Sequence, residues 1–457
     1  MKFFDKNNLL LFAISFLIPT WSIPHTIAIR YTAAVAALML GITAVRNIRV
    51  NKAVYLPLVF LLIYFILISI LSDTPFETLR NLWDDWGKSL LFFLVGACLC
   101  VKTTHSKRAS VNFFLAFLFS VPCLVHICLV VVKFWDTGAI PWGWSGLSES
   151  HGDLGYTGLF AAPLLCATLL INLQTKRRLV IIAAGFLLCA NFISILIAQS
   201  RGGTLFYVFS ILVFLACFAK KRSADSSKAG SALLLASLVA LSTIGLMWGS
   251  NAKTEGRLPA TEKLILGFTL VEMVDAFQVS CHGQSALDKS GFFLSSDSST
   301  KQKLSKAIDD GDVWRIFGLK TGLLLVHENP MGFYGAKNAY ETLMINKCGA
   351  QPHVPLANTH NGWINTALTI GAPGALLFFV FLVMSLLLGL KEQRSVGDTS
   401  LVSTILCTTC LVWITRSFLD AAQQDQMLEM QFFVLGYLVS NARAFTNLSP
   451  SIPERDS

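Results

Sequence analysis

Stretches of about 20 predominantly apolar residues recur along almost the whole chain and constrain its fold more than any other feature. A helix of that length spans the hydrocarbon core of a bilayer. The composition agrees, because 54% of the 457 residues are hydrophobic and only 14% are charged; soluble domains carry about 25% charged residues. The alternating segments of about ten residues that are typical of a membrane barrel are not found. The sequence therefore predicts an all-α polytopic membrane protein.

The apolar runs predict about twelve transmembrane helices. The first run, Leu9–Ile23, follows two lysines as a signal peptide would, but no small-residue cleavage site follows it, so we interpret it as a retained helix. The predicted organisation is helices 1–9 within residues 1–249, an outer segment over 250–360, and helices 10–12 with a short tail over 361–457. The expected spans are 8–22, 26–45, 53–72, 88–101, 110–133, 155–173, 179–199, 203–219, 230–249, 361–390, 400–418 and 426–442.

The connections between these spans alternate in charge, which predicts the orientation. Loops such as 46–52, 102–108 and 176–178 are basic, whereas segments such as 72–88 and 417–426 are acidic or neutral. Because basic loops stay in the cytoplasm, both termini are predicted to be cytoplasmic and the 250–360 segment to lie outside. Topology thus accounts for the net charge of +9, and nucleic acid is not expected as a partner.

Arg201 lies between two predicted spans, in the sequence QSRGGTLF. An isolated arginine there is usually an interfacial side chain that extends toward water. The two glycines that follow would allow a ligand to approach the backbone closely, and the restarting helix would point free N–H groups toward it. Since guanidinium can bind phosphate through two hydrogen bonds, Arg201 is a candidate anion-binding residue.

A second basic candidate lies in the helix predicted within GDVWRIFGLKTGLLLV of the outer segment. Arg315 and Lys320 fall off its apolar face, and Pro330 ends the helix in a turn. On their own, these two charges are more simply interpreted as a solvated basic face. The residues expected on the apolar face are Trp314, Phe317, Thr321 and Leu324.

His360 directly precedes the tenth predicted span. Imidazole exchanges a proton near neutral pH, and the N-terminus of the helix that follows would favour the neutral form that a general base needs. Taken alone, the residue is more simply interpreted as a capping or interfacial histidine. Its neighbour Asn361 is a secondary candidate, and Arg416, near the outer end of another span, is a further candidate anion contact.

No metal site or cofactor is expected. The motif Asp310-Gly-Asp312 has the spacing of a metal and nucleotide-sugar site, but it is better explained as the acidic start of the Arg315 helix. Cys281 and Cys348 both lie in the outer segment, where an oxidising exterior would permit a disulfide between them. Spacing alone does not establish that pairing.

Together these residues resemble the O-antigen ligase family of Gram-negative bacteria, which shares a domain with O-antigen polymerases. The ligase motif of that family is His, then Asn, Ser or Gln, nine residues, Gly, two residues, and Gly, Thr or Tyr. His360-Asn361 followed by Gly371 and Gly374 matches this motif in full.

Two further sequences carry the resemblance. SRGG at 200–203 is similar to the family's arginine turn, and Arg315 with the later ENPMGFYG is similar to its arginine-bearing periplasmic helix. One departure is Leu319, because the family often has an aromatic residue four positions after its arginine.

The resemblance implies a glycosyltransferase in lipopolysaccharide biosynthesis with a helical membrane fold of the GT-C type. The donor would be O-antigen polysaccharide on undecaprenyl pyrophosphate, and the acceptor a sugar hydroxyl of lipid A–core, at the periplasmic face of the inner membrane. Transfer would invert the anomeric centre without metal, nucleotide or other cofactor. Arg201 and Arg315 would bind the pyrophosphate and stabilise its developing charge, and His360 would activate the acceptor.

Three alternatives stay open at this point. An O-antigen polymerase would use the same donor with a different acceptor, and a protein O-oligosaccharyltransferase would modify a protein. A polysaccharide lipid transporter is the alternative outside the enzymes. Transporters place ionisable groups near the middle of their spans, whereas the candidates here cluster at one face, which favours surface chemistry.

Overall fold

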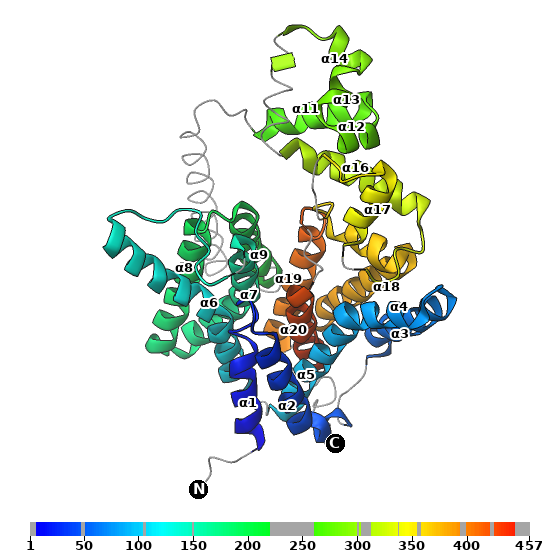
Figure 1. Cartoon of the computed structure of the whole chain (residues 1–457). Coiled ribbons are helices and arrows are strands. Elements are labelled where there is room, and N and C mark those ends of the chain that lie inside the picture. The colour runs from blue at the N-terminus through cyan, green and yellow to red at the C-terminus, as the bar shows by residue number, and fades with distance from the viewer. Residues whose placement is uncertain are drawn as a thin grey trace, which may run out of the picture.

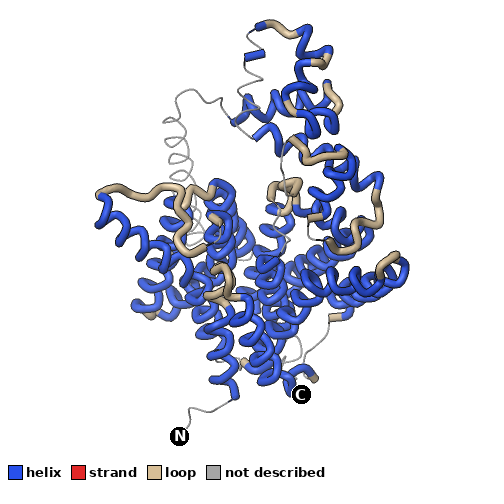
Figure 2. The backbone as a smooth tube through the Cα atoms, viewed as in Figure 1, coloured by secondary structure: helices blue, strands red, loops and turns tan. Residues whose placement is uncertain are grey.

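The computed structural model describes residues 6–46, 51–103, 107–148, 150–219, 260–298, 301–302, 312–336, 338–353, 358–393, 399–420 and 425–443. All regular structure in these ranges is helical (Figure 1), and helices joined by loops make up the whole described backbone (Figure 2). The predicted all-α class is therefore confirmed for the described part of the chain.

Every predicted span except 230–249 coincides with a helix, and 230–249 lies outside the described residues. By length and composition, 6 of the described helices could each cross a membrane. The chain is thus a polytopic helical membrane protein, while the count of twelve spans stays a prediction. The bundle helices are α1 (Lys6–Leu17), α2 (Ile27–Val45), α3 (Lys52–Leu71), α5 (Lys88–Lys102), α6 (Arg108–Thr137), α7 (His151–Thr175), α8 (Arg178–Ile197), α9 (Arg201–Ala219), α18 (Gly362–Glu392), α19 (Thr399–Arg416) and α20 (Asp425–Arg443).

The first helix is shorter than the sequence predicts. It was expected to continue to residue 22, but α1 ends at Leu17, and a series of turns leads into α2. The reason is Pro19, because a residue that precedes proline avoids the helical conformation. The buried Trp21 in these turns still packs against Phe160 of α7, with ring centroids 6.0 Å apart.

The centre of the bundle is built where α5 and α20 approach each other closely. A Cβ atom on Gly96 would lie 2.1 Å from the carbonyl oxygen of Phe433, and one on Gly436 would lie 2.0 Å from that of Phe93. Small residues at these two positions therefore allow backbone-to-backbone contact, as is usual between membrane helices. Buried aromatic rings of α5, α18 and α20 then pack around this contact.

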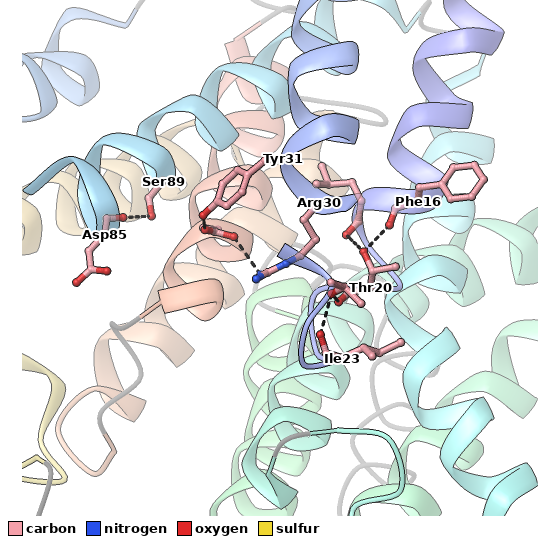
Figure 3. Close-up of polar contacts among 10 residues, drawn as sticks. Phe16, Thr20, Ile23, Arg30, Tyr31, Asp85 and Ser89 are labelled. Atoms are coloured by element: carbon pink, nitrogen blue, oxygen red, sulfur yellow. Dashed lines mark hydrogen bonds and ion pairs between the residues drawn. The ribbon is translucent and has the colours of Figure 1, made fainter. Parts of the chain in front are cut away.

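A buried ion pair joins α2 to α20. The guanidinium of Arg30 lies 3.2 Å from the carboxylate of Glu429, and the hydroxyl of Tyr31 donates a hydrogen bond to the same carboxylate. Figure 3 shows the side chains of Arg30 and Tyr31 converging on it, beside the turn between α1 and α2. Both charged side chains are at most 5% exposed.

The described part of the segment between α9 and α18 forms helices beyond one end of the bundle (Figure 1). We call α11 to α14 the cap, and the bundle end that lies toward it the cap end. The helix α16 lies between the cap and α17, which in turn packs on α18. The bounds are α11 (Ala260–Met273), α12 (Ala276–His282), α13 (Gln284–Asp288), α14 (Gly291–Ser295), α16 (Asp312–Glu328) and α17 (Ala339–Cys348).

The helix α18 is broken near its start. Gly371 has a φ of 80° and a ψ of 158°, a conformation that is essentially restricted to glycine. The helix after this break is about 30 Å long at 1.5 Å per residue, which by itself matches the hydrocarbon core. The predicted span 361–390 is therefore two elements, a short helix of two to three turns at the cap end and a membrane-length helix below it.

Candidate active site

His360 lies in a sharply folded turn immediately before α18. Its φ is 52°, in the left-handed region that few residues other than glycine adopt. Side-chain amides hold the turn in place: the N–H of His360 donates to Oδ1 of Asn358 at 3.0 Å, and the hydroxyl of Thr359 donates to Oδ1 of Asn365 at 2.8 Å. The strained backbone of this turn is stabilised by neighbouring side chains, and it holds the imidazole at the N-terminal end of the short helix.

Asn361 has a structural part in this turn. Its Oδ1 accepts a hydrogen bond from the N–H of Ile364 at 3.0 Å, which caps α18. Its Nδ2 donates to the carbonyl of Phe418 at 3.0 Å, in the turn that follows α19. Since both ends of the amide are engaged, the geometry assigns Asn361 to the positioning of His360.

Two charged groups flank His360 from different elements. Burial lowers the pKa of His360 below its ordinary value of 6.5, the positive charge of Arg315 lowers it further, and the negative charge of Asp420 raises it. The helix α16 therefore brings the charge of Arg315, and the turn after α19 the charge of Asp420, within electrostatic range of the imidazole. The net effect keeps His360 neutral, and therefore able to accept a proton, at neutral pH.

Arg315 lies on the exposed side of α16, as the sequence predicts. The buried face differs by one position, because Leu325 is 1% exposed whereas Leu324, expected inside, is 38% exposed. This helix packs tightly against the His360 turn, since a Cβ on Gly322 would lie 2.6 Å from the Thr359 side chain. Because other residues form the buried face of α16, Arg315 stays exposed to solvent near His360.

Lys320 and Arg315, which the sequence treats as a pair, have different surroundings. The ammonium of Lys320 donates a hydrogen bond to the carbonyl of Val271 near the end of α11. A cation near the C-terminal carbonyls of a helix is favourably placed, so Lys320 joins α16 to the cap. Of these two charges, Arg315 is the one whose field reaches His360.

Arg416 is buried beneath the site, with 1% of its side chain exposed. Its guanidinium lies 3.5 Å from the ring centroid of Tyr156 and donates to Oδ2 of Asp420 at 3.3 Å. The hydroxyl of Tyr156 also donates to Oδ2 of Asp420, at 3.0 Å. As an anion contact, Arg416 would need exposure that it does not have here, and the geometry instead makes it a support for Asp420.

Asp420 is the site residue that the sequence analysis did not single out. Its side chain is 40% exposed, and the N–H of Gly362 donates to its backbone carbonyl at 3.0 Å, which fixes its turn against the start of α18. The signal that could have found it is the spacing, because Arg416 and Asp420 stand four residues apart, as helical ion pairs do. In the sequence, the same turn served only as a marker of orientation.

Arg201 is exposed at the first residue of α9. The helix α9 packs on α19, and its Phe206 ring centroid lies 5.6 Å from the guanidinium carbon of Arg416. Arg201 is therefore on a helix that borders the site, but no contact joins it to His360 or Arg315 among the described residues. Its convergence with them stays a prediction.

The two glycines after Arg201 have different environments. A Cβ on Gly202 would meet no atom within 4 Å, so this position is open, as a ligand-approach site would require. A Cβ on Gly203 would lie 2.8 Å from the Cα of Gly155 in α7. Gly203 therefore allows close packing between α7 and α9. From the sequence, this glycine is interpreted instead as a position where a ligand approaches the backbone.

The glycines of the His-Asn motif explain its spacing. The nine residues after Asn361 form the short helix 362–370, and the chain must then break at Gly371. A Cβ there would lie 2.5 Å from the hydroxyl of Tyr64 and 2.7 Å from the carbonyl oxygen of Met331. The motif thus encodes a helix of fixed length that holds His360 above the membrane span.

The loop after α16 satisfies the backbone groups freed by this break. The N–H groups of Phe333 and Gly335 donate to carbonyls of the short helix at 2.6 and 2.8 Å, and the carbonyl of Pro330 accepts from Ala372 at 2.8 Å. The sequence ENPMGFYG is therefore the partner of the His-Asn motif in space. This contact joins the helix that carries Arg315 to the helix that carries His360.

Cys281 and Cys348 form a disulfide, with Cα atoms 5.4 Å apart. Of the acidic motif at 310–312, only Asp312 is described, as the first residue of α16. Within the described ranges, no group of three or more His, Cys, Asp or Glu side chains could hold a metal ion.

Residues 184–379 match the family model described as O-antigen ligase. The resemblance drawn from the sequence is confirmed over this region, which contains Arg201, Arg315 and His360. Arg416 and Tyr156 lie outside it, on the helices α19 and α7, and Asp420 lies outside it in the turn after α19. No curated protein matches the chain.

Proposed function

We propose that this protein is an O-antigen ligase that transfers polysaccharide from undecaprenyl pyrophosphate to a sugar hydroxyl of lipid A–core. The observation that carries the proposal is the placement of His360 in the turn before the short helix, within electrostatic range of Arg315 and Asp420. A base beside a cation is the pairing needed to deprotonate a hydroxyl while an anion departs. The family match to residues 184–379 supports the donor class.

The proposed reaction is a single displacement at the anomeric carbon of the donor. The acceptor oxygen forms a bond to that carbon, and the bond from the carbon to the pyrophosphate oxygen breaks, so the configuration inverts. The hydroxyl proton passes to His360, and the bonding electron pair leaves with the pyrophosphate. Asp420 stabilises the imidazolium that forms, and its position is fixed by Arg416 and Tyr156.

The arginines take the part that a metal ion plays in many phosphate-dependent enzymes. Guanidinium stays charged at all physiological pH values and can form two parallel hydrogen bonds to phosphate oxygens. Arg315 is exposed beside His360, and Arg201 is exposed at the start of α9. We assign both to the pyrophosphate, with Arg201 reaching it from the opposite side of α19.

The basic connections on one side of the bundle support the proposed location. They favour a cytoplasmic location for both termini, and a location at the periplasmic face of the inner membrane for the cap, α16 and His360. Lipid-linked polysaccharide and lipid A–core would both reach the site from the outer leaflet, which suits a site at the outer end of a transmembrane helix.

Deletion of the gene tests the function. We expect the O-antigen ladder to disappear from silver-stained lipopolysaccharide, while undecaprenyl-linked polymer of full length accumulates. A core that still carries a single O-unit would identify a polymerase. An unchanged ladder would contradict both activities and favour a protein O-oligosaccharyltransferase or a transporter.

A further inference from the structure

The disulfide between Cys281 and Cys348 joins two elements that are far apart in the sequence. Cys281 lies near the end of α12 in the cap, and Cys348 is the last residue of α17, 67 residues later. The helix α16, which carries Arg315, lies between these two points in the chain and packs against both elements. The cross-link therefore closes a loop of chain that contains the Arg315 helix.

The helix α16 is held on two sides by separate apolar clusters. On the cap side, Ile316 and Phe317 pack with residues of α11 and α12, and a Cβ on Gly267 would lie 2.4 Å from Ile316. On the other side, Leu325 packs with residues of α17 and α18, including Tyr340. Arg315 lies on the half of the helix that packs against the cap, so the cap helps to fix the backbone from which the exposed guanidinium extends.

Polar contacts reinforce the same arrangement around the disulfide. Lys347, next to Cys348, lies 2.8 Å from the carboxylate of Glu328 at the end of α16 and 5.0 Å from the ring centroid of Phe277 in α12. The N–H of His353 donates to the carbonyl of Cys281 at 3.2 Å. These exposed contacts are individually weak, so among the described contacts the covalent bond is the strongest single restraint between the cap and α17.

We propose that the Cys281–Cys348 disulfide is a positioning device that clamps the cap onto α16 and thereby holds Arg315 beside His360. This inference rests on the proposed function, since it concerns how the pyrophosphate ligand is placed. Without the cross-link, the cap is tied to α17 only by side-chain contacts, and the guanidinium samples positions away from the imidazole. Because electrostatic and hydrogen-bond interactions weaken with distance, donor binding weakens first.

The consequence for kinetics is selective. The KM for the lipid-linked donor rises and kcat falls, because Arg315 also stabilises the departing pyrophosphate, while the KM for the lipid A–core acceptor keeps its value. The charged groups that face His360 are Arg315 from α16 and Asp420 from the turn after α19. Withdrawal of Arg315 removes an influence that favours the neutral imidazole, so the acid limb of kcat/KM for the donor moves to higher pH.

The test compares full-length wild-type protein, oxidised and after treatment with dithiothreitol, with the variant Cys281→Ser/Cys348→Ser. Dithiothreitol supplies two electrons and two protons, gives two thiols on the protein and is itself oxidised to a cyclic disulfide. Mass spectrometry of alkylated thiols establishes that both cysteines were reduced. The matched control is Cys128→Ser/Cys189→Ser, which removes two exposed free cysteines of the bundle.

We expect about a tenfold rise in donor KM for the reduced protein and for the Cys281→Ser/Cys348→Ser variant, reversed in the wild type by reoxidation. The control variant keeps the wild-type donor KM and its sensitivity to dithiothreitol. An unchanged donor KM after verified reduction overturns the inference. The inference is also overturned if kcat falls while the KM values for both substrates stay unchanged. If oxidised wild-type protein performs no transfer, the proposed function has failed instead.

Discussion

Two clusters in this protein share the same three side-chain types, an arginine, a carboxylate and a tyrosine, but they differ in what the carboxylate faces. In the first, Arg416 and Tyr156 hold Asp420, whose side chain is 40% exposed and acts on His360. In the second, Arg30 and Tyr31 hold Glu429, whose side chain is 5% exposed.

The comparison teaches that chemistry alone does not mark a functional charge. The Glu429 cluster joins α2 to α20 inside the bundle, so its charges balance one another and stabilise the fold. The carboxylate of the Asp420 cluster is more exposed, and its charge also influences His360, which lies beyond the cluster. Exposure of the carboxylate, together with a titratable neighbour, separates the two.

The largest difference is expected when each carboxylate is neutralised. Asp420→Asn should lower the transfer rate about 100-fold, because the imidazolium of His360 loses its counter-charge. Glu429→Gln should leave the rate of the folded protein nearly unchanged but cost about 3–5 kcal/mol of stability, since it leaves the buried Arg30 uncompensated. Transfer per folded molecule and thermal unfolding in detergent measure the two effects. A large rate loss in Glu429→Gln at normal folding would break the comparison.

The pH dependence should separate the clusters next. Transfer requires neutral His360, so kcat/KM falls as the pH drops through the pKa of His360, which lies below its ordinary value. Asp420 raises that pKa, so Asp420→Asn should move the acid limb to lower pH. Glu429→Gln should leave the limb where it is. A limb that moves to higher pH in Asp420→Asn would contradict the assigned influence.

Removal of each tyrosine hydroxyl should have the smallest effect. Tyr156→Phe removes one donor to Asp420 and should slow transfer several-fold, with little loss of stability because Arg416 still holds the carboxylate. Tyr31→Phe removes a donor to a buried carboxylate and should cost about 1–3 kcal/mol of stability without slowing transfer. Comparable changes in rate for both variants would show that the two clusters are equivalent.

Much of the fold can be predicted from the sequence because a long apolar run marks each membrane helix. Two errors have physical causes that can be named. Pro19 ends α1 early, and the break in α18 depends on how Gly371 meets Tyr64 and the loop after α16. The second cause is tertiary, so no period in the sequence of α18 could reveal it.

The site is predicted less completely than the fold. His360 and Arg315 carry motifs, and in the structure the charge of Arg315 influences the imidazole. Asp420 carries no motif, since its importance arises from packing between α7, α19 and the start of α18. The same packing buries Arg416, which the sequence could not distinguish from an exposed arginine such as Arg201.

The most direct test of the account is the transfer activity of His360→Ala, with donor binding measured separately. Purified protein in liposomes would be supplied with undecaprenyl-linked polysaccharide and lipid A–core. The account predicts donor affinity close to that of the wild type and transfer reduced about 10³-fold or more, because only the base is lost. Transfer within about tenfold of the wild-type rate would contradict the assignment of His360 as the base.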